Sequence, residues 1–321
     1  MEMPSVFVAR KLPEEVLKAL RTFADVEMWD KEDEVCPRDL LLEKAKTSDA
    51  LLTMLSDQVD KELLDACEGV KVIANLAVGY DNVDVEYAKE KGIIITNTPD
   101  VLTETTADLT FLLLMSAARR VTEAAAYIKE GKWTSWSPML LAGADVHHKT
   151  IGIIGMGNIG RAVAKRAKGF DMNILYHNRS RDTEAEESLG AEYRSFEDLL
   201  QTSDFVVCMT PLTSETKGMF DAGAFKKMKR EAIFVNTSRG GTVVEEDLIA
   251  ALRNGVIAGA GLDVFENEPI RADHPILQLE NAVALPHIGS ATRETRFAMM
   301  ACCIENIKQV LEGKKPLTPV R

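Results

Sequence analysis

A glycine-rich segment, GMGNIG at residues 155–160, constrains the fold of this chain more than any other feature. It follows the apolar run IGII at 151–154 and opens a stretch with helical periodicity, NIGRAVAKRAKGF. Strand, glycine-rich turn and helix in this order are typical of a βαβ unit that binds a dinucleotide, because backbone N–H groups at the helix start hold the diphosphate. The predicted dinucleotide contacts in this segment are Gly155, Gly157, Asn158, Ile159 and Gly160.

Short β-rich runs alternate with amphipathic helical stretches along most of the chain, which indicates parallel sheets built from βαβ units. A first series of runs lies at 6–9, 50–54, 72–76 and 93–97. A second, longer series lies at 150–155, 173–176, 205–209, 232–236, 258–264 and 282–285. The chain is therefore predicted to be an α/β protein with two doubly wound parallel sheets, of which the second is the larger.

Two linkers divide these series into domains. The first lies near Pro99, before a long helical stretch at 103–128 whose frequent apolar residues indicate burial on more than one side. The second lies near His287, and a single helical pattern at 291–313 follows it. We therefore predict a Rossmann dinucleotide-binding domain, 100–287, inserted in a flavodoxin-like substrate-binding domain formed by 1–99 and 288–321.

Charge and cysteine content argue against several other functions. Lys and Arg number 38 and Asp and Glu 50, and the formal net charge of −12 disfavours a surface for nucleic-acid phosphates or an anionic membrane. The five cysteines lack the two-residue spacing of zinc sites, so we expect no metal and reduced thiols in a cytoplasmic protein. No apolar signal core is found near the N-terminus, and the most apolar stretch, 109–118, is far shorter than the roughly 18 residues that cross a bilayer.

The residues after the strand at 173–176 indicate which dinucleotide is preferred. A cofactor with a free ribose 2′-hydroxyl is usually held by an acidic residue about 20 positions after the glycine-rich turn. Here the strand runs into Asn178, Arg179 and Ser180, and no carboxylate follows until Asp182. A guanidinium and a hydroxyl suit a 2′-phosphate, so NADP(H) is favoured, with NAD(H) as the alternative. The competing interpretation is that Arg179 is a solvated loop charge.

Three further segments follow strands of the second series: NTSRGG at 236–241, GLDVFENEP at 261–269 and PHIGSAT at 286–292. In an open parallel sheet the carboxyl ends of the strands share one edge, so these loops should converge beside the bound dinucleotide. Together they offer a guanidinium, a carboxylate and an imidazole. These groups suffice to polarise a carbonyl and to move a proton.

With these motifs the sequence resembles the D-isomer-specific 2-hydroxyacid dehydrogenases nearly from end to end, beginning at LAVGYDN, residues 76–82. Within that family it is most similar to glyoxylate and hydroxypyruvate reductases, through LAVGYDNVD, WTSWSPMLLAG at 133–143 and HNRSR at 177–181. The resemblance implies that Arg239, Glu268 and His287 are the catalytic residues.

The chemistry of these three side chains gives each an expected role. His287 would be the general acid that protonates the carbonyl oxygen as a hydride arrives, since imidazole changes its charge near neutral pH. Glu268, bound to the other ring nitrogen, would select the tautomer and favour the protonated ring. Arg239 would bind the substrate carboxylate and polarise the ketone. Glu266 is an alternative to Glu268, but only Glu268 precedes a proline, as the family pattern requires.

The resemblance also implies further contacts. Val78 and Gly79 are expected to offer backbone amides to the substrate carboxylate, and Leu55 to line the same pocket. Trp136 is expected to reach across a dimer interface and favour small keto acids, unless it only packs a local interface. The remaining expected cofactor contacts are Thr210, Pro211, Thr237, Ser238, Asp263, Gly289 and Ser290. The other histidines, expected to be structural or solvated, are His147, His148, His177 and His274.

The sequence thus predicts an NADPH-dependent, homodimeric enzyme that reduces small 2-keto acids such as glyoxylate and hydroxypyruvate to 2-hydroxy acids. A 2-ketogluconate reductase of the same family is one alternative, because the sequence does not reveal the depth of the pocket. A dinucleotide-sensing binding protein, like the transcriptional corepressors that share this fold, is another. The complete set of Arg, Glu and His favours an enzyme over that alternative. We expect no nucleic-acid or membrane partner.

Overall fold

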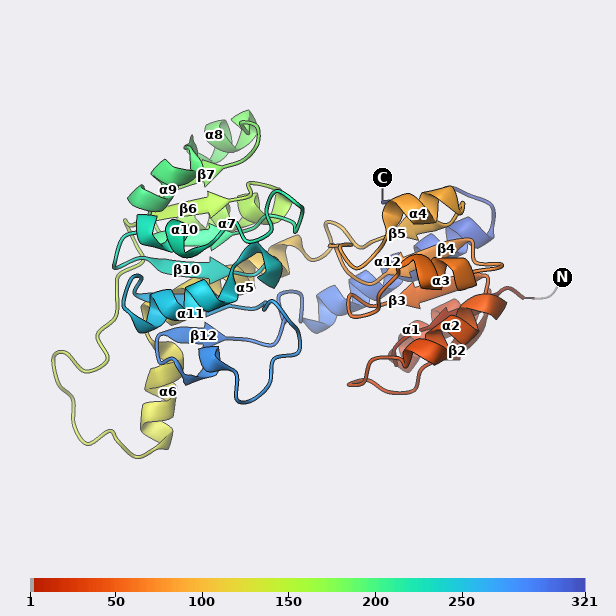
Figure 1. Ribbon diagram of the computed structural model, residues 1–321, viewed down its shortest axis with the longest axis horizontal. Helices are drawn as coiled ribbons and strands as arrows, with labels where there is room; N and C mark the ends of the chain where they lie inside the picture. The colour runs from red at the N-terminus through yellow and green to blue at the C-terminus, as the bar shows by residue number, and fades with distance from the viewer. Residues whose placement is uncertain (1–2, 321) are drawn as a thin grey trace. The chain divides into compact units, whose positions relative to one another are not determined.

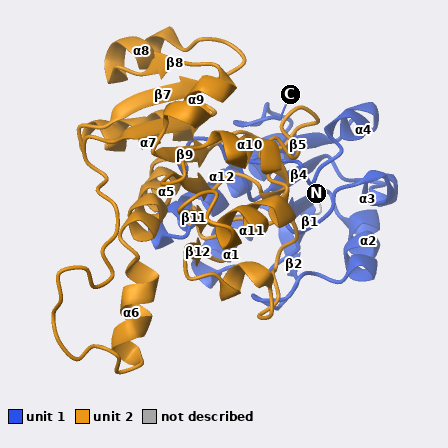
Figure 2. Cartoon of the chain, turned by 60° about the vertical axis from the view of Figure 1, so that its left-hand side comes forward, with its two compact units in different colours: residues 1–102, 291–321 blue, residues 103–290 orange. Residues whose placement is uncertain are grey.

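The computed structural model of the chain describes residues 3–320, which form two compact units (Figures 1 and 2). Unit 1 runs from the N-terminal strand to Leu102 and resumes at Ala291, and unit 2 is Thr103–Ser290. The borders expected from the sequence, after residues 99 and 287, lie three residues before these positions. Residues 288–290, expected in the substrate-binding domain, therefore belong to unit 2.

Unit 1 is a five-stranded parallel sheet in the order β2-β1-β3-β4-β5, the order of flavodoxin-like sheets. Its strands are β1 (Ser5–Val8), β2 (Asp25–Met28), β3 (Ala50–Thr53), β4 (Val72–Asn75) and β5 (Ile94–Thr96). Its helices are α1 (Glu14–Leu20), α2 (Arg38–Thr47), α3 (Lys61–Ala66), α4 (Val85–Glu90) and α12 (Arg293–Leu311). Helices α2, α3 and α4 pack on one face of the sheet, while α1 and α12 lie together on the other. The predicted C-terminal helix thus packs back on β3, β4 and helix α1.

The edge strand β2 is missing from the sequence-based prediction. Its residues alternate between exposed, as at Asp25 and Glu27, and half-buried, as at Val26 and Met28. An edge strand with one solvated side carries a weak apolar signal, whereas the three central strands of this sheet, β1, β3 and β4, are nearly continuous apolar runs.

Unit 2 is a seven-stranded parallel sheet in the order β12-β11-β10-β9-β6-β7-β8. Its strands are β6 (Thr150–Ile154), β7 (Asn173–His177), β8 (Glu192–Tyr193), β9 (Phe205–Cys208), β10 (Ile233–Asn236), β11 (Gly259–Leu262) and β12 (Ala282–Ala284). The chain runs outward from β6 to β8 on one side and from β9 to β12 on the other. The neighbours β6 and β9 therefore mark the point of reversal, where open α/β sheets bind ligands. This arrangement confirms the predicted Rossmann fold.

Helices cover both faces of the unit 2 sheet. The helices of unit 2 are α5 (Thr103–Ala118), α6 (Val121–Lys129), α7 (Asn158–Lys168), α8 (Thr183–Leu189), α9 (Phe196–Thr202), α10 (Ala222–Lys227) and α11 (Glu245–Arg253), with short 3-10 helices η1 (Gly240–Thr242) and η2 (Pro275–Gln278). One core joins the sheet to α5 and α7, and a second joins it to α9, α10 and α11. Both faces are thus buried, which explains the strongly apolar strands.

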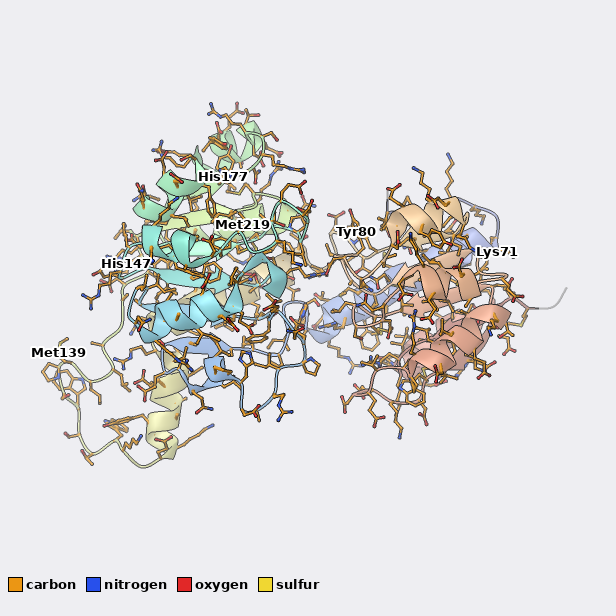
Figure 3. The ribbon with its side chains drawn as sticks, in the orientation of Figure 1. Lys71, Tyr80, Met139, His147, His177 and Met219 are labelled. Carbon is orange, nitrogen blue, oxygen red and sulfur yellow. The ribbon has the colours of Figure 1, made fainter. Side chains whose placement is uncertain are left out.

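The predicted single helix at 103–128 is wrong, because two helices occupy this stretch. Arg120 lies between them in a left-handed conformation, with φ of 52°, which ends the first helix. Helix α5 is largely buried, whereas α6 has no buried residue. Residues 121–145, which we call the arm, project from the body of unit 2 in both views (Figures 1 and 2). Met139, labelled in Figure 3, lies on the arm and is 77% exposed.

None of the helices formed by residues 3–320 is both long enough and apolar enough to cross a membrane.

Candidate active site

Six loops of unit 2 follow the carboxyl ends of its parallel strands and therefore share one edge of the sheet. They begin after β6, β7, β9, β10, β11 and β12. Backbone hydrogen bonds continue the strand pairing into these loops, as from Asp263 N–H to Asn236 O at 2.9 Å and from Leu285 N–H to Leu262 O at 2.8 Å. The fold thus brings all the site residues predicted in unit 2, apart from Trp136, to one edge.

The three glycines of the glycine-rich turn serve different purposes. Gly155 has φ of 102°, and a Cβ there would lie 2.6 Å from the carbonyl carbon of Met209. A Cβ on Gly160 would lie 2.2 Å from the carbonyl oxygen of Gly155. Nothing lies within 4 Å of the corresponding position on Gly157, the N-cap of α7. Packing within unit 2 thus requires two of the glycines, and the third leaves room for an anion at the helix N-terminus.

Asn178, expected to contact the cofactor, uses its side chain to hold the glycine-rich turn. Its Oδ1 accepts a hydrogen bond from Met156 N–H at 2.7 Å. The loop after β7 and the loop after β6 are therefore coupled through one amide side chain.

The charged residues that follow Asn178 differ in their partners. Arg181 pairs with Glu186 at 2.6 Å. Asp182 caps α8 and pairs with Arg161 at 2.7 Å, so its carboxylate is already engaged. Arg179 and Ser180 are exposed, and their side chains make no hydrogen bond or ion pair within residues 3–320.

The side chain of Asn236, the last residue of β10, holds the turn that carries Arg239 through hydrogen bonds. The Nδ2 of Asn236 donates to Arg239 O at 3.0 Å, and its Oδ1 accepts from Ser238 N–H at 3.0 Å. The hydroxyl of Thr242 donates to the same carbonyl of Arg239 at 2.7 Å. The half-buried guanidinium donates from Nη1 to Ser238 O at 2.9 Å. Buried polar side chains thus orient the turn.

His287 and Glu268 form a hydrogen-bonded pair. Nδ1 of His287 and Oε2 of Glu268 are 2.6 Å apart, and the two side chains are 26% and 28% exposed. The other oxygen of Glu268, Oε1, accepts from Phe265 N–H at 2.9 Å. Because a carboxylate only accepts hydrogen bonds, Nδ1 carries the proton and Nε2 is the ring nitrogen that can face a ligand. The φ of 53° at His287 lies in the left-handed region, which is sparsely populated outside glycine.

The charge state of Glu268 follows from its surroundings. Burial would raise the pKa of Glu268, but the hydrogen bond and charge of His287, the N–H of Phe265 and the charge of Arg239 hold this pKa below its usual value. Glu268 is therefore ionised at neutral pH. Glu266, the alternative acid in the sequence, is exposed, and its backbone N–H donates to Glu245.

Asp263 offers a buried acceptor to a ligand. Its Oδ1 accepts from Ile288 N–H at 2.8 Å, whereas its buried Oδ2 has no partner among the described residues. Burial raises the pKa of Asp263, against the opposing effects of Ile288 N–H, the charge of His287 and the nearby N–H of Gly289. A buried acceptor without a partner requires an explanation, and the carboxamide of a nicotinamide would donate to it. With the open position at Gly157, these residues fit a dinucleotide.

The remaining predicted cofactor contacts line the same edge. Thr237 Oγ1 lies 2.6 Å from Thr110 Oγ1 of α5. Ser238 Oγ and Thr210 Oγ1 lie 3.4 and 3.6 Å from the Sγ of Cys208, the last residue of β9. Pro211, Gly289 and Ser290 complete the set on the neighbouring loops.

The predicted substrate residues of unit 1 share the carboxyl edge of its own sheet, where Leu55 follows β3 and Val78 and Gly79 follow β4. Asn75 Nδ2 donates to Gly79 O at 3.2 Å and to Asn82 Oδ1 at 3.2 Å. No hydrogen bond from the N–H groups of Val78 and Gly79 is made in the part of the chain described. These two amides are available to an anion.

Trp136 lies apart from the residues above. It belongs to the arm and is 78% exposed, so within one chain it packs against none of them.

Two comparisons decide the family. Residues 111–289 match the family described as D-isomer specific 2-hydroxyacid dehydrogenase, NAD binding domain. Over 317 residues the chain is 48% identical to a glyoxylate reductase of Thermococcus litoralis, which covers 98% of this chain and 95% of the relative. The chain belongs to the D-isomer-specific 2-hydroxyacid dehydrogenase family. It is an oxidoreductase with an NAD(P)-binding domain, and the resemblance seen in its motifs is confirmed.

Solved structures agree with this assignment. A protein of Thermus thermophilus matches this dehydrogenase with a TM-score of 0.92 and 45% identity, covering 99% of this chain and 100% of that one. An NADPH-dependent glyoxylate/hydroxypyruvate reductase of Sinorhizobium meliloti, solved with NADP and malonate, matches with a TM-score of 0.85 and 32% identity, covering 99% and 97%.

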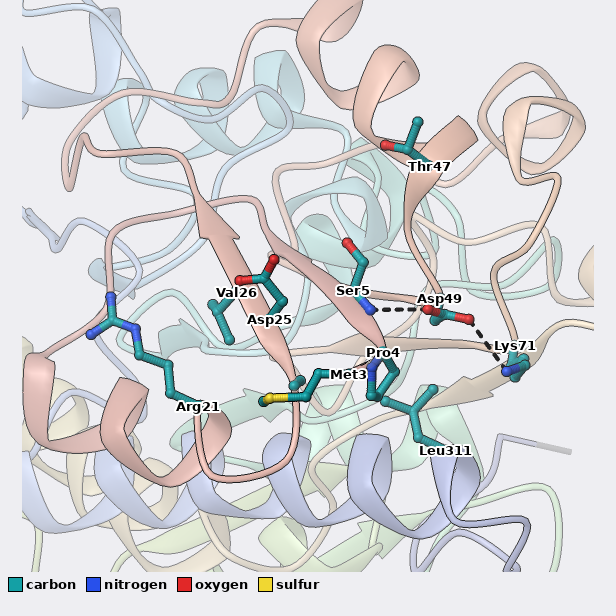
Figure 4. Close-up of a pocket in the computed structure, with 11 residues that line it drawn as sticks. Met3, Pro4, Ser5, Arg21, Asp25, Val26, Thr47, Asp49, Lys71 and Leu311 are labelled. Atoms are coloured by element: carbon teal, nitrogen blue, oxygen red, sulfur yellow. Dashed lines mark hydrogen bonds and ion pairs between the residues drawn. The ribbon is translucent and has the colours of Figure 1, made fainter. Parts of the chain in front are cut away.

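The dehydrogenase also has a hollow of about 1100 Å³ at the amino-terminal edge of the unit 1 sheet, opposite the edge described above (Figure 4). Its lining includes Asp49, which accepts from Ser5 N–H at 2.9 Å and pairs with Lys71 at 3.3 Å. The hollow contains none of the predicted site residues.

Sequence reasoning missed the residues that support the site of this dehydrogenase. Asn75 and Asn236 each end a buried apolar strand, and a polar residue at that position is a signal that could have found them. His147, labelled in Figure 3, and His148 are exposed, and the ring of His177 packs near Tyr193 and Phe196, as expected for structural or solvated histidines. His274 differs, because it pairs with Glu245, and only the fold brings these two residues together.

Proposed function

We propose that this dehydrogenase reduces glyoxylate and hydroxypyruvate to their 2-hydroxy acids, with NADPH as the preferred hydride source. The 2.6 Å contact between His287 Nδ1 and Glu268 Oε2, at the edge that also carries the Arg239 turn and the glycine-rich turn, is the observation that carries this proposal. The names of the Thermococcus litoralis and Sinorhizobium meliloti relatives support the choice of substrates.

His287 is the proposed general acid. With Nδ1 bound to Glu268, Nε2 of the protonated ring donates its proton to the carbonyl oxygen as that oxygen gains negative charge. The ionised carboxylate of Glu268 stabilises the protonated ring and keeps it in one orientation. In the reverse direction the neutral ring accepts the proton of the hydroxyl group.

Arg239 is the proposed ligand of the substrate carboxylate, because a guanidinium binds a carboxylate through two parallel hydrogen bonds and keeps its charge throughout. The same group polarises the neighbouring ketone. We expect Arg239→Ala to lower kcat/KM for glyoxylate by about 10²- to 10³-fold and to leave the Kd of NADPH nearly unchanged. Steady-state kinetics and a fluorescence titration measure the two quantities, and a parallel loss of both would exclude this role.

In unit 1 we propose that Leu55, Val78 and Gly79 contact the substrate. The N–H groups of Val78 and Gly79, which donate to no acceptor among residues 3–320, support a role in binding its carboxylate.

The dinucleotide supplies the hydride when it is bound. We propose that the first amides of α7, at Asn158 and Ile159, hold its diphosphate next to Gly157, where a side chain would otherwise stand. Asp263 Oδ2 accepts from the carboxamide and so orients the ring face. The other proposed contacts are Gly155, Gly160, Asn178, Thr210, Pro211, Thr237, Ser238, Gly289 and Ser290.

A preference for NADPH over NADH is supported by the loop after β7. Arg179 and Ser180 are exposed and make no side-chain hydrogen bond in the described chain, while the nearby acid, Asp182, is engaged by Arg161. A guanidinium without a hydrogen-bonded protein partner favours a phosphate, and the acid that follows on the same loop, Asp182, is already paired.

We further propose that the dehydrogenase is a homodimer whose arm is covered by a second copy. Large apolar side chains are exposed on the arm, and such clusters mark protein interfaces. They are Val121 (49%), Ile128 (60%), Trp133 (58%), Trp136 (78%) and Met139 (77%). In the dimer Trp136 would reach the substrate pocket of the partner and limit its size.

A substrate panel tests the proposed function. The fall in NADPH or NADH absorbance is followed after addition of glyoxylate, hydroxypyruvate, pyruvate or 2-ketogluconate. We expect rapid NADPH oxidation with the two named substrates and slower oxidation of NADH. Faster turnover of 2-ketogluconate than of glyoxylate and hydroxypyruvate would show that the enzyme acts on a larger substrate. Tight NADPH binding without turnover of any of the four acids would refute the proposal.

A further inference from the structure

Unit 2 contains a second largely buried histidine–carboxylate pair, which the proposed reaction does not use. His274 Nε2 lies 3.0 Å from Glu245 Oε1, and the two side chains are only 19% and 16% exposed. Burying two titratable side chains outside the catalytic residues costs free energy, because both lose contact with water. A pair retained at that cost is expected to have a role of its own.

The hydrogen bonds of His274 define its tautomer. Glu245 only accepts, so Nε2 of His274 carries a hydrogen, and Nδ1 accepts from Ile276 N–H at 3.4 Å. With one nitrogen facing Glu245 and the other facing Ile276 N–H, the ring is held from both sides. Its ring also packs edge-on near Phe265, with centroids 6.2 Å apart.

Glu245 binds both ends of the loop that carries Glu268. Its Oε1 binds His274, and its Oε2 accepts from Glu266 N–H at 3.2 Å. We call the segment 266–274 the acid loop. Most of its residues are exposed, so few buried apolar contacts hold it in place. The carboxylate of Glu245, the first residue of α11, therefore holds the two ends of the acid loop together.

The base of the acid loop also touches the turn that carries Arg239. A Cβ on Gly240 would lie 1.9 Å from the carbonyl carbon of Phe265 and 2.4 Å from the nitrogen of Glu266. The residue after Arg239 and the residues before the acid loop are thus in backbone contact, which only glycine permits at this position. Glu245 follows the same turn five residues later, so it anchors the acid loop to the segment of Arg239.

The geometry points to Glu245 and His274 as positioning residues. They hold the acid loop so that Glu268 keeps its hydrogen bond to His287 and both residues stay aligned with Arg239. This inference rests on the proposed role of Glu268. Neither residue touches the reacting groups, and they act through the backbone of residues 265–268. A displacement of a catalytic group by about 1 Å can lower a rate by as much as two orders of magnitude, so such an anchor affects the rate and not only the stability.

A specific signature distinguishes positioning from a general structural role. The contacts with His287 and Phe265 N–H offset the effect of burial on Glu268. If the acid loop loosens, those contacts weaken and the pKa of Glu268 rises. The acid limb of kcat would then move to higher pH. Loss of packing elsewhere in unit 2 would not produce this shift.

The test uses the full-length protein with glyoxylate and NADPH. Glu245→Gln removes the charge and leaves an amide that can satisfy only one of its two donors. His274→Leu removes the donor at similar volume, and His274→Gln restores an N–H that can reach Glu245. The matched control is Glu246→Gln, which removes the neighbouring, exposed charge on the same helix.

We expect Glu245→Gln and His274→Leu to lower kcat about tenfold or more, to raise the pH of the acid limb and to leave the Kd of NADPH unchanged. Hydrogen exchange of backbone amides in 266–274 should be faster in both, and His274→Gln should recover most of the activity. The inference would be overturned if Glu245→Gln and His274→Leu matched Glu246→Gln in rate, pH profile and hydrogen exchange. It would also be overturned if either variant lost turnover and NADPH binding to the same extent. An inactive wild type would refute the proposed function instead, and the exchange measurement would still test the anchor.

Discussion

The loops after β10, β11 and β12 differ from the loop after β7 in how firmly they are held. In the first group, buried amides and hydroxyls bind the Arg239 turn, and Glu268 bonds both His287 and the backbone of Phe265. In the loop after β7, Arg179 is exposed without a hydrogen-bonded side-chain partner in the described chain. All four loops lie at one edge of one sheet. Only the loops after β10, β11 and β12 are preorganised by hydrogen bonds within the protein.

This difference separates two tasks. Proton transfer demands that donor and acceptor be fixed to a fraction of an ångström, and a dense hydrogen-bond network supplies that precision. The proposed selection between NADPH and NADH needs only a charge at the right place, which the exposed Arg179 would supply. Substitutions in the first region should therefore abolish activity, whereas those in the second should change preference.

The largest effect is expected for His287→Asn. Asparagine can keep a hydrogen bond to Glu268 but cannot donate a proton as an acid, so kcat for glyoxylate should fall by about 10³-fold, within the range for general acid catalysis. NADPH binding, measured by fluorescence titration, should stay within about twofold. A variant that retains a tenth of the activity would place the acid elsewhere.

Glu268→Gln should have a smaller effect than His287→Asn, about 10²-fold on kcat at neutral pH, because the protonated form of His287 loses its charged partner. The wild type should lose activity as the pH falls through the lowered pKa of Glu268, and so at more acidic pH than an ordinary glutamate would cause. Glutamine does not titrate, so this acid limb should disappear from the kcat profile of the variant. An unchanged limb would show that another group produces it.

Arg179→Ala should have the smallest effect and the most selective one. Removal of an exposed guanidinium should weaken NADPH binding by about tenfold and leave NADH binding unchanged, since only NADPH carries the 2′-phosphate. Isothermal titration of both dinucleotides measures this ratio.

Two neighbouring positions serve as controls for Arg179. Arg181→Ala removes an arginine already paired with Glu186 and should affect both dinucleotides little. Asn178→Ala removes the bond to Met156 N–H and should weaken both equally. Equal weakening of both dinucleotides by Arg179→Ala would remove the argument for a 2′-phosphate contact.

The sequence predicted what depends on local pattern. The glycine-rich turn between an apolar strand and a helix indicated the Rossmann sheet, because this arrangement needs only neighbouring residues. The prediction of a single helix at 103–128 was wrong. The left-handed backbone of Arg120 ends the first helix, and no glycine or proline at that position signals it in the sequence. Strand β2 was missed because its exposed edge dilutes the apolar signal.

The site divides in the same way. Residues at strand ends could be assigned to one edge, as for Glu268 and His287, which the structure brings to 2.6 Å. The anchor of the acid loop could not, because Glu245 and His274 are brought together only by the packing of α11 against a long loop. Asn178 shows a third case, in which the position was predicted but the side chain binds its own protein.

Two of the three tryptophans in this chain, Trp133 and Trp136, lie on the arm, and both are largely exposed to solvent. Indole emission shifts to shorter wavelength when the ring leaves water. The intrinsic fluorescence of the protein therefore reports mainly on the arm, and dilution or titration experiments can follow its coverage without any added label.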